Sequence, residues 1–258
     1  MISQEQNKIL QVENLTKQFG GLTAVHDLDF YAMESEILGV IGPNGAGKST
    51  AINMISGFYP PTAGRIVFDG KEITNLKGHQ ISKLGIGRNF QSSILFMPLP
   101  VVANVYTAHH NKYKTNLFSR LLRLPSVTRE EESFRQRSMQ ILVEMGLGNL
   151  AFEPTMNLPH GHQRILSVCI ALATDPKLLL LDEPMTGMNQ TEIENMIALI
   201  RKIRDRGITI IMIEHNMNAV MSLCDRIVVL DYGKKIAEGL PAEIQNNEEV
   251  IEAYLGKE

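Results

Sequence analysis

The segment best suited to chemistry is glycine-rich: Gly42-Pro43-Asn44-Gly45-Ala46-Gly47-Lys48-Ser49. It matches the phosphate-binding pattern of Gly, four residues, Gly, Lys and then Ser or Thr. Glycines let the backbone curl until successive N–H groups point at phosphate oxygens, and the N-terminus of a following helix adds positive partial charge. An apolar run at residues 37–41 precedes the segment, and a helix is expected to begin near Lys48. The pattern predicts that Lys48 reaches the β- and γ-phosphates of a nucleotide and that the Ser49 hydroxyl ligates Mg²⁺.

Two carboxylates, Asp182 and Glu183, follow the apolar run Leu178-Leu179-Leu180-Leu181. Ligands of open α/β sheets lie beyond the carboxyl ends of the strands, so both groups are expected near the phosphates. There Asp182 would hold Mg²⁺, usually through water, and Glu183 would act as general base on the attacking water. The alternative is a strand that ends in solvated charge. The phosphate loop upstream makes the catalytic interpretation the better one.

His215 and Gln91 are the other two candidate site residues. His215 follows the apolar run at residues 208–213, and a neutral imidazole at the end of a strand can sense the γ-phosphate and align the water with Glu183. A lone histidine is more often structural, and its place in this fold argues for the catalytic role. Gln91 follows Arg88-Asn89-Phe90. It is expected to reach Mg²⁺ or the water, although taken alone it would be an ordinary surface glutamine.

The elements that must position these residues alternate between short apolar runs and helical patterns, which predicts an α/β fold with a parallel sheet. The first two strands should meet at Gly20-Gly21. The later strands are apolar throughout, as expected of strands covered on both faces. The predicted strands are residues 9–19, 23–30, 37–41, 64–68, 178–181, 208–213 and 227–230.

Two helices can be placed by their end signals. One should begin after Asn189, which forms a capping box with Glu192, and should end by Gly207. The other should begin at Thr128, in a capping box with Glu131, and end at Gly146.

The segment from residue 92 to residue 159 is helical in pattern and lacks clear buried strands. Between Lys112 and Arg137 it carries seven basic and three acidic residues. A solvated helical face explains such a run, and a surface near anionic lipid or an acidic partner is the functional alternative.

Composition excludes several classes of protein. The chain has 258 residues, a formal net charge of −3, 44% hydrophobic and 21% charged residues, as in an ordinary globular protein. The longest apolar run, Val168–Ala173, falls far short of the roughly 20 residues that span a bilayer. No secretory signal is expected at Met1-Ile2-Ser3-Gln4-Glu5, and the mild acidity argues against nucleic-acid binding. Cys169 and Cys224 show no metal-binding spacing, which favours free thiols.

Taken together, the motifs resemble an ABC-type ATPase subunit. Their order is Phe19, the phosphate loop, Gln91, the segment Leu158–Gln163, Asp182-Glu183 and His215. Within that superfamily, the chain is most similar to ATPase subunits of branched-chain amino acid importers. The narrower likeness rests on Phe19–Val25, Gly57–Tyr59, Gly87–Gln91, Gly187–Asn189, the insert around Leu117–Pro125 and the ending Val250–Gly256.

This resemblance implies one domain over residues 1–258, with a P-loop NTPase core, an N-terminal antiparallel β subdomain and an inserted α-helical subdomain. The core would comprise residues 1–91 and 160–258, and the helical subdomain residues 92–159. ATP and Mg²⁺ are the implied ligands. Lys48, Glu183 and His215 would be catalytic, and Ser49, Gln91 and Asp182 would hold the metal. The implied ATP-binding residues are Phe19, stacked on adenine, and Val25, Gly42, Pro43, Asn44, Gly45, Ala46, Gly47, Lys48, Ser49 and Thr50.

In this family two ATPase subunits face each other head to tail, so that each ATP lies between one phosphate loop and the partner's signature segment. The usual signature is Leu-Ser-Gly-Gly-Gln, whereas this chain reads Leu158-Pro159-His160-Gly161-His162. Gly161 would present its N–H to the partner's γ-phosphate from a helix start. Pro159 supplies neither hydroxyl nor N–H, so one expected contact, worth on the order of 1.5–3 kcal/mol, is missing. A metal site at His160 and His162 is disfavoured because no carboxylate or cysteine lies nearby in sequence.

The resemblance implies an ATP hydrolase that drives solute import, of branched-chain amino acids or related small organic solutes. Two separate transmembrane permease subunits would form the pore, a periplasmic binding protein would deliver the solute, and this chain would lie peripherally on the cytoplasmic face of the inner membrane. Its partner ATPase would be a sister subunit or a second copy. Leu95, Phe96 and Met97 would dock the permease or would be buried core.

Three alternative functions are compatible with these motifs. The first is an ATPase for lipid or lipopolysaccharide export, the second is a soluble ABC-type ATPase acting on DNA or ribosomes, and the third is a catalytically weak subunit, because of Pro159. One phosphate loop and no heptad run count against the second.

Overall fold

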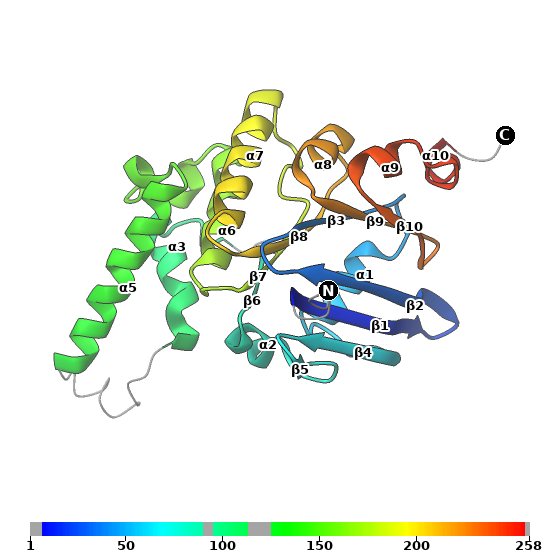
Figure 1. The fold of residues 1–258 in the computed structure, drawn as a ribbon. Coiled ribbons are helices and arrows are strands. Elements are labelled where there is room, and N and C mark those ends of the chain that lie inside the picture. Colours follow the sequence, from blue (N-terminus) through cyan, green and yellow to red (C-terminus); the bar gives the residue numbers. More distant parts are fainter. Residues whose placement is uncertain (1–6, 90–94, 113–124, 256–258) are drawn as a thin grey trace.

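A computed structural model of the chain describes residues 7–89, 95–112 and 125–255 (Figure 1). In these residues two sheets form, one of four strands in the order β2-β1-β4-β5 and one of six in the order β10-β9-β3-β8-β7-β6. Gln91 and most of the insert around residues 117–125 lie outside the described residues.

The four-stranded sheet is antiparallel and comprises β1 (Lys8–Phe19), β2 (Leu22–Met33), β4 (Ala63–Phe68) and β5 (Lys71–Glu72). β1 and β2 form a hairpin in which Phe19 pairs with Leu22 across Gly20-Gly21, and Gly20 has a φ of 58°. The predicted strands at 9–19 and 23–30 are therefore confirmed. β2 runs three residues further than expected.

The six-stranded sheet comprises β3 (Ile37–Ile41), β6 (Ile86–Asn89), β7 (Leu178–Asp182), β8 (Thr209–Ile213), β9 (Arg226–Asp231) and β10 (Lys234–Gly239). Its strands pair in parallel, except that β10 runs antiparallel to β9. All residues of β3, β7 and β8 are buried, as their uniform apolar sequences predict. β6 and β10 were not predicted, because neither is an apolar run.

Alternate residues of these strands pack into two apolar clusters, one on each face of the sheet. Leu179 and Leu181 join the cluster that includes α6 (His160–Leu172), α7 (Gln190–Arg204) and α8 (Met217–Leu223). Leu178 and Leu180 join the cluster formed with α1 (Lys48–Ile55), α2 (Gly78–Leu84) and the antiparallel sheet. The six-stranded sheet is thus the middle layer of the molecule (Figure 1).

The structure confirms the capping box predicted at the start of α7 and the end predicted before Gly207. The Asn189 side chain accepts the N–H of Glu192 at 3.0 Å, and the Glu192 carboxylate accepts the N–H of Asn189 at 2.9 Å. The helix ends at Arg204, just before Gly207, whose φ is 86°. After β10 the chain adds α9 (Pro241–Gln245) and α10 (Glu248–Leu255).

The predicted helical segment contains α3 (Val101–Thr107), the 3₁₀ turn η2 (Ala108–Lys112), α5 (Pro125–Glu144) and the 3₁₀ turns η3 (Gly148–Leu150) and η4 (Thr155–Asn157). α3 and α5 lie side by side at one end of the molecule (green in Figure 1). The predicted capping box at Thr128 is wrong, because α5 is already helical at Pro125 and Thr128 lies inside it. Gly146 follows the end of α5 as expected, with a φ of 79°. No helix in the described part of the chain has the length and apolar character needed to cross a membrane.

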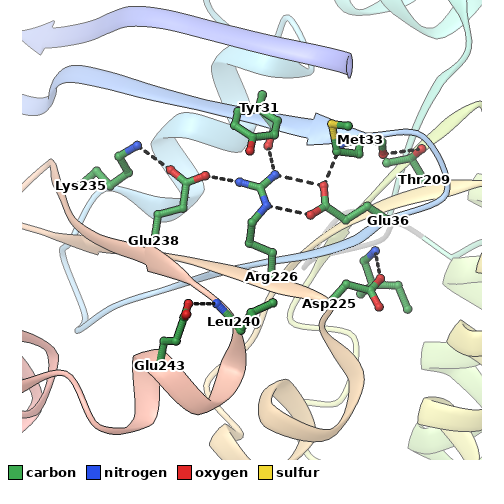
Figure 2. A network of polar contacts seen from close by, with 11 residues as sticks. Tyr31, Met33, Glu36, Thr209, Asp225, Arg226, Lys235, Glu238, Leu240 and Glu243 are labelled. Carbon is green, nitrogen blue, oxygen red and sulfur yellow. Dashed lines mark hydrogen bonds and ion pairs between the residues drawn. The ribbon is translucent and has the colours of Figure 1, made fainter. Parts of the chain in front are cut away.

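A polar cluster joins the two sheets at Arg226, the first residue of β9 (Figure 2). Its Nε and Nη2 atoms donate to the two carboxylate oxygens of Glu36 at 2.8 and 3.1 Å, and Nη2 also donates to the Tyr31 carbonyl at 2.6 Å. Nη1 pairs with Glu238 of β10. One guanidinium therefore connects β2, the turn before β3, β9 and β10.

Candidate active site

The phosphate loop connects the end of β3 to the start of α1 and folds tightly against two neighbouring backbones. Gly42 has a φ of 149°, and a Cβ there would lie 2.0 Å from the Leu230 carbonyl oxygen. Gly47 has a φ of 97°, and a Cβ there would lie 2.6 Å from the carbonyl oxygen of Ala24. Only glycine fits at both positions. The strand–loop–helix context predicted for the loop is confirmed.

Lys48 is buried in this loop at the start of α1. Its Nζ atom donates to the carbonyl oxygens of Gly42 and Pro43 at 2.7 and 2.8 Å. Burial lowers the pKa of Lys48, and the nearby carboxylates of Glu183 and Asp182 oppose that shift. Ser49 beside it is exposed, as are Asn44 and Gly45 in the loop, whereas Ala46 is buried and Thr50 half-buried.

Asp182 ends β7 and is held by two side chains of β6. Its Oδ2 atom accepts a hydrogen bond from Arg88 Nη2 at 3.0 Å, and its backbone N–H donates to Asn89 Oδ1 at 2.7 Å. Its Oδ1 atom is buried and has no hydrogen-bond partner among the described residues. Sequence patterns assign no role to Arg88 or Asn89, because nothing local links them to a residue more than 90 positions later.

Glu183 and His215 meet at the ends of the neighbouring strands β7 and β8. The Nε2 atom of His215 lies 2.9 Å from Oε1 of Glu183, and the Thr186 hydroxyl donates to Oε2 at 3.2 Å. Glu183 has a φ of 50°, a left-handed conformation that is uncommon for a non-glycine residue and is often found at functional sites. The structure therefore brings together the two residues that the sequence predicted as base and sensor.

Glu214 is a further residue at this edge that the sequence reasoning missed. It is buried, its Oε1 accepts the N–H of Met185 at 2.7 Å, and its Oε2 accepts the N–H of His215 at 3.1 Å. Burial raises the pKa of Glu214, while the backbone N–H groups that it accepts lower it. The carboxylate thereby ties the loop after Glu183 to the loop that carries His215. Its signal was a charged residue directly after a fully buried strand.

Phe19 lies beside Tyr59, with ring centroids 5.4 Å apart in an edge-to-face arrangement. Phe19 is 45% exposed, and the Lys17 Nζ atom lies over its ring, 5.2 Å from the centroid. Val25 is fully buried, and its Cγ2 atom would lie 3.2 Å from a Cβ at Gly47. Val25 therefore packs against the phosphate loop.

The signature-like segment begins α6. Pro159 is the N-cap residue, and its carbonyl accepts the N–H of Gln163 at 3.1 Å. His160 is the first helical residue, so the expected helix start at Gly161 is confirmed. Gly161 is buried, and a Cβ there would lie 2.4 Å from Glu192 Oε1. Leu158 is also buried, His162 is half-buried, and Pro159 and His160 are exposed.

Comparison with known protein families and curated proteins supports the resemblance to ABC-type ATPases. The family described as ABC transporter matches residues 25–186, and the family described as Branched-chain amino acid ATP-binding cassette transporter matches residues 234–258. The chain is 40% identical to the high-affinity branched-chain amino acid transport ATP-binding protein BraF of Pseudomonas aeruginosa, over 96% of this chain and 98% of BraF. It is 41% identical to LivG of Salmonella typhimurium, another such protein, with the same coverage. The lipopolysaccharide export system ATP-binding protein LptB of Haemophilus influenzae is 30% identical over 97% of this chain and 98% of LptB.

Solved structures show the same fold. A nucleotide-free ATP-binding cassette from an ABC transporter superposes with a TM-score of 0.85 at 29% identity, over 97% of this chain and 100% of that chain. A dimeric ATP-binding cassette in a post-hydrolysis state, bound to ADP and Pi, superposes with a TM-score of 0.76 at 25% identity, over 90% of this chain and 98% of that chain. The predicted fold class and the resemblance to ABC-type ATPases are confirmed. This chain belongs to the ABC transporter family and is one of its ATP-hydrolysing subunits.

Proposed function

We propose that this chain is the ATPase subunit of a branched-chain amino acid importer and that it drives solute through separate permease subunits. The observation that carries this proposal is the likeness to BraF and LivG along almost the entire chain, including the C-terminal residues 234–258. Residues 234–255, the described part of this stretch, form β10, α9 and α10, which are separate from the elements that carry the phosphate loop and the two carboxylates.

The export alternative is the weaker one. LptB matches the chain over a similar length at 30% identity, compared with 40% for BraF. The match of the branched-chain family to residues 234–258 adds evidence for the importer branch.

The catalytic roles follow from the contacts at the carboxyl edge of the sheet. Glu183 would accept the proton of the attacking water, and His215, 2.9 Å from its carboxylate, would orient both the base and the water. Lys48 would contact the β- and γ-phosphates together with the N–H groups of the loop from Gly42 to Thr50. Phe19, which is 45% exposed, would stack on the adenine, and Val25 would pack against the phosphate loop.

The residues at this edge fit a magnesium ion. Asp182 Oδ1 is a buried carboxylate oxygen without a partner among the described residues, and Ser49 offers an exposed hydroxyl at the start of α1. Hard oxygen donors of this kind suit Mg²⁺. When bound, the ion would neutralise charge on the β- and γ-phosphates. Gln91, the third predicted ligand, lies outside the described residues and stays a prediction.

The working unit would be a pair of ATPase subunits, as in the dimeric cassette that superposes on this chain. In such a pair Gly161, at the start of α6, would direct its N–H at the partner's ATP, and the helix dipole would assist. We favour a sister subunit over a second copy. The missing contact at Pro159 would weaken only the ATP site that this chain completes for its partner.

The permease would dock on an apolar surface of the helical segment, which we name the Met97 surface: Phe96, Met97, Leu99 and Met156. All four side chains are exposed, Phe96 by 51% and Met156 by 62%. Backbone hydrogen bonds join the two segments, from Met156 N–H to the Met97 carbonyl at 2.9 Å and from Thr155 N–H to the Leu99 carbonyl at 3.0 Å. Leu95 packs against the core instead, so it would support this surface from below. The chain would then act as one domain, with residues 92–159 transmitting motion from the core at 1–91 and 160–258 to a permease at the cytoplasmic face of the membrane.

Uptake measurements in cells test the proposal. Replacing the wild-type chain with Glu183→Gln should abolish ATP-driven uptake of labelled leucine, isoleucine and valine and leave lipopolysaccharide export intact. Glu194→Gln, an exposed glutamate of α7, is the matched control and should transport normally. Normal leucine uptake with a defect in lipopolysaccharide export would contradict the importer assignment.

A further inference from the structure

Arg88 is a buried arginine that links three elements around the candidate active site. Its side chain is 8% exposed. Nη2 donates to Asp182 Oδ2 at 3.0 Å, and Nη1 donates to Asn53 Oδ1 at 2.7 Å and to Ser56 Oγ at 2.8 Å. Asp182 ends β7, Asn53 lies in α1, and Ser56 is the C-cap residue directly after α1. The guanidinium therefore connects the strand that ends in the carboxylate to the helix that follows the phosphate loop.

The acceptors on α1 lie on the same face of the helix as Ser49. Asn53 and Ser56 are four and seven residues after it, a spacing that aligns side chains along one side of a helix. Ser49 and Asp182 are the two residues proposed above to hold the metal. Arg88 thus contacts Asp182 itself, and it contacts the face of α1 that carries Ser49.

A guanidinium suits this position for a physical reason. It is planar and presents its donors in a rigid fork, so acceptors on either side are held at a fixed separation. Hydrogen bonds that involve charged groups are also shorter and stronger than neutral ones. With Oδ2 engaged by Arg88, and the Asp182 N–H engaged by Asn89 at 2.7 Å, the carboxylate is oriented with Oδ1 left unpartnered among the described residues.

We infer that Arg88 is a positioning residue that builds the cation site: it sets the separation between Ser49 and Asp182 and reserves Asp182 Oδ1 for the metal. This inference rests on the metal-binding role proposed above for Asp182. Removing groups that orient metal ligands typically costs 10–100-fold in metal affinity. The contact would therefore act on metal binding rather than on nucleotide binding as such.

Arg88 is also connected, through Asn53 and Tyr59, to the residue proposed to bind the adenine. Asn53 Nδ2 donates to the Tyr59 hydroxyl at 3.2 Å, and Tyr59 packs edge-to-face on Phe19. A continuous set of contacts thus runs from the ring proposed to stack on adenine to the carboxylate proposed to hold the metal. The distance between the metal site and the adenine site would depend on this set of contacts.

The test measures metal and nucleotide binding separately on the purified full-length chain. Mn²⁺ serves as the probe, and its affinity for ADP-saturated protein is measured by electron paramagnetic resonance. The affinity for ADP without metal is measured by calorimetry in EDTA. For Arg88→Lys, which keeps the charge but lacks the fork, we expect Mn²⁺ affinity to fall about 10–100-fold. Metal-free ADP affinity should stay within about twofold of wild type, because its phosphate-binding groups are untouched.

A second variant guards against misfolding. Asn53→Ala combined with Ser56→Ala removes the anchors of Arg88 on α1 and leaves the Arg88–Asp182 pair intact, so no buried charge loses its partner. It should lower Mn²⁺ affinity in the same direction by a smaller factor. The matched control is Arg65→Met, which removes an exposed arginine paired with Glu72 at 3.0 Å and should change neither affinity.

Each outcome decides the inference. It is overturned if Arg88→Lys binds Mn²⁺ within twofold of wild type, or if metal-free ADP affinity falls in parallel, which would make Arg88 a purely structural residue. Asp182→Asn separates this failure from that of the proposed site. If Asp182→Asn loses Mn²⁺ affinity and Arg88→Lys does not, only the role of Arg88 is wrong. If Asp182→Asn binds Mn²⁺ normally, the metal assignment fails and this inference fails with it.

Discussion

His215 Nε2 lies 2.9 Å from Glu183 Oε1, although the two residues are 32 positions apart in the chain. Strand register explains the contact, because Asp182 of β7 pairs with Ile213 of β8 in the parallel ladder. The residues that follow the two strands must therefore emerge side by side. The left-handed backbone of Glu183, whose N–H donates to the Ile213 carbonyl at 3.0 Å, fixes the carboxylate at this edge.

Glu183→Gln should abolish ATP hydrolysis by the purified chain and leave ATP binding nearly unchanged. Glutamine fills the same volume and can still contact His215, but it cannot accept the proton of the attacking water. The rate of ATP hydrolysis is measured from the release of phosphate. ATP binding is measured by calorimetry. Hydrolysis by Glu183→Gln at the wild-type rate would show that another group is the base.

His215→Ala should lower kcat by about 10²–10³-fold, the usual effect of removing one preorganised polar group at a reacting centre. ATP affinity should change by less than about twofold, because the phosphate loop is intact. Steady-state kinetics with separate kcat and KM values check this expectation. His26→Ala, which removes a side chain that is 49% exposed, is the control. A change in KM alone would mean that His215 contributes to binding and not to turnover.

Glu214 should give the protein a pH-dependent stability term. Burial raises its folded-state pKa above the ordinary value of 4.5, so the folded state binds this proton more readily than the unfolded state. Its contribution to the free energy of unfolding is therefore full below the unfolded pKa and is lost as pH rises through the folded pKa. The stability of wild type relative to Glu214→Gln should fall across that window and become constant above it. Urea unfolding of both proteins from pH 4 upward measures the difference, and a difference independent of pH would contradict it.

Pro159→Ser restores the serine that the usual signature carries at this position. Because Pro159 is the N-cap of α6, serine would also cap the helix, which typically contributes about 1 kcal/mol. Loss of proline offsets this gain by about 0.4–1 kcal/mol through the unfolded state, so Tm should change little. Hydrolysis by the assembled transporter should increase markedly if a missing γ-phosphate contact limits turnover. An unchanged rate of hydrolysis would contradict the hypothesis that Pro159 weakens the ATP site that this chain completes for its partner.

Local patterns predicted the elements whose stability is local. The strand at Leu178–Leu181 was recognisable because every residue is apolar, and the start of α7 because Asn189 and Glu192 satisfy each other's N–H groups within one turn. The same logic failed at Thr128, where a matching pair lies inside a helix that is already formed at Pro125. Capping residues favour a helix start but do not prevent the helix from extending upstream.

The phosphate loop was predictable because its residues are contiguous in the sequence, between a strand and a helix. Site residues whose hydrogen-bond partners lie on distant strands were not predictable. Arg88 lies in β6, a strand of four residues that include Gly87 and Asn89 and show no apolar run. Only its parallel pairing with β7 makes this segment a strand and brings Arg88 to Asp182. Glu214 was missed for a similar reason, since its partners include Met185 in another loop.

The strand order of the six-stranded sheet has a consequence for how the protein is made. β3 lies between β8 and β9, so Ile37 pairs with Ile210 and Leu38 with Arg226. A ribosome that has just completed the phosphate loop must extend the chain beyond residue 209 before β3 has a neighbour. At typical synthesis rates this takes roughly 10–30 s. Throughout that time an entirely apolar strand stays unpaired, so we expect the nascent chain to be a chaperone client and its folding to finish only after β9 has left the ribosome.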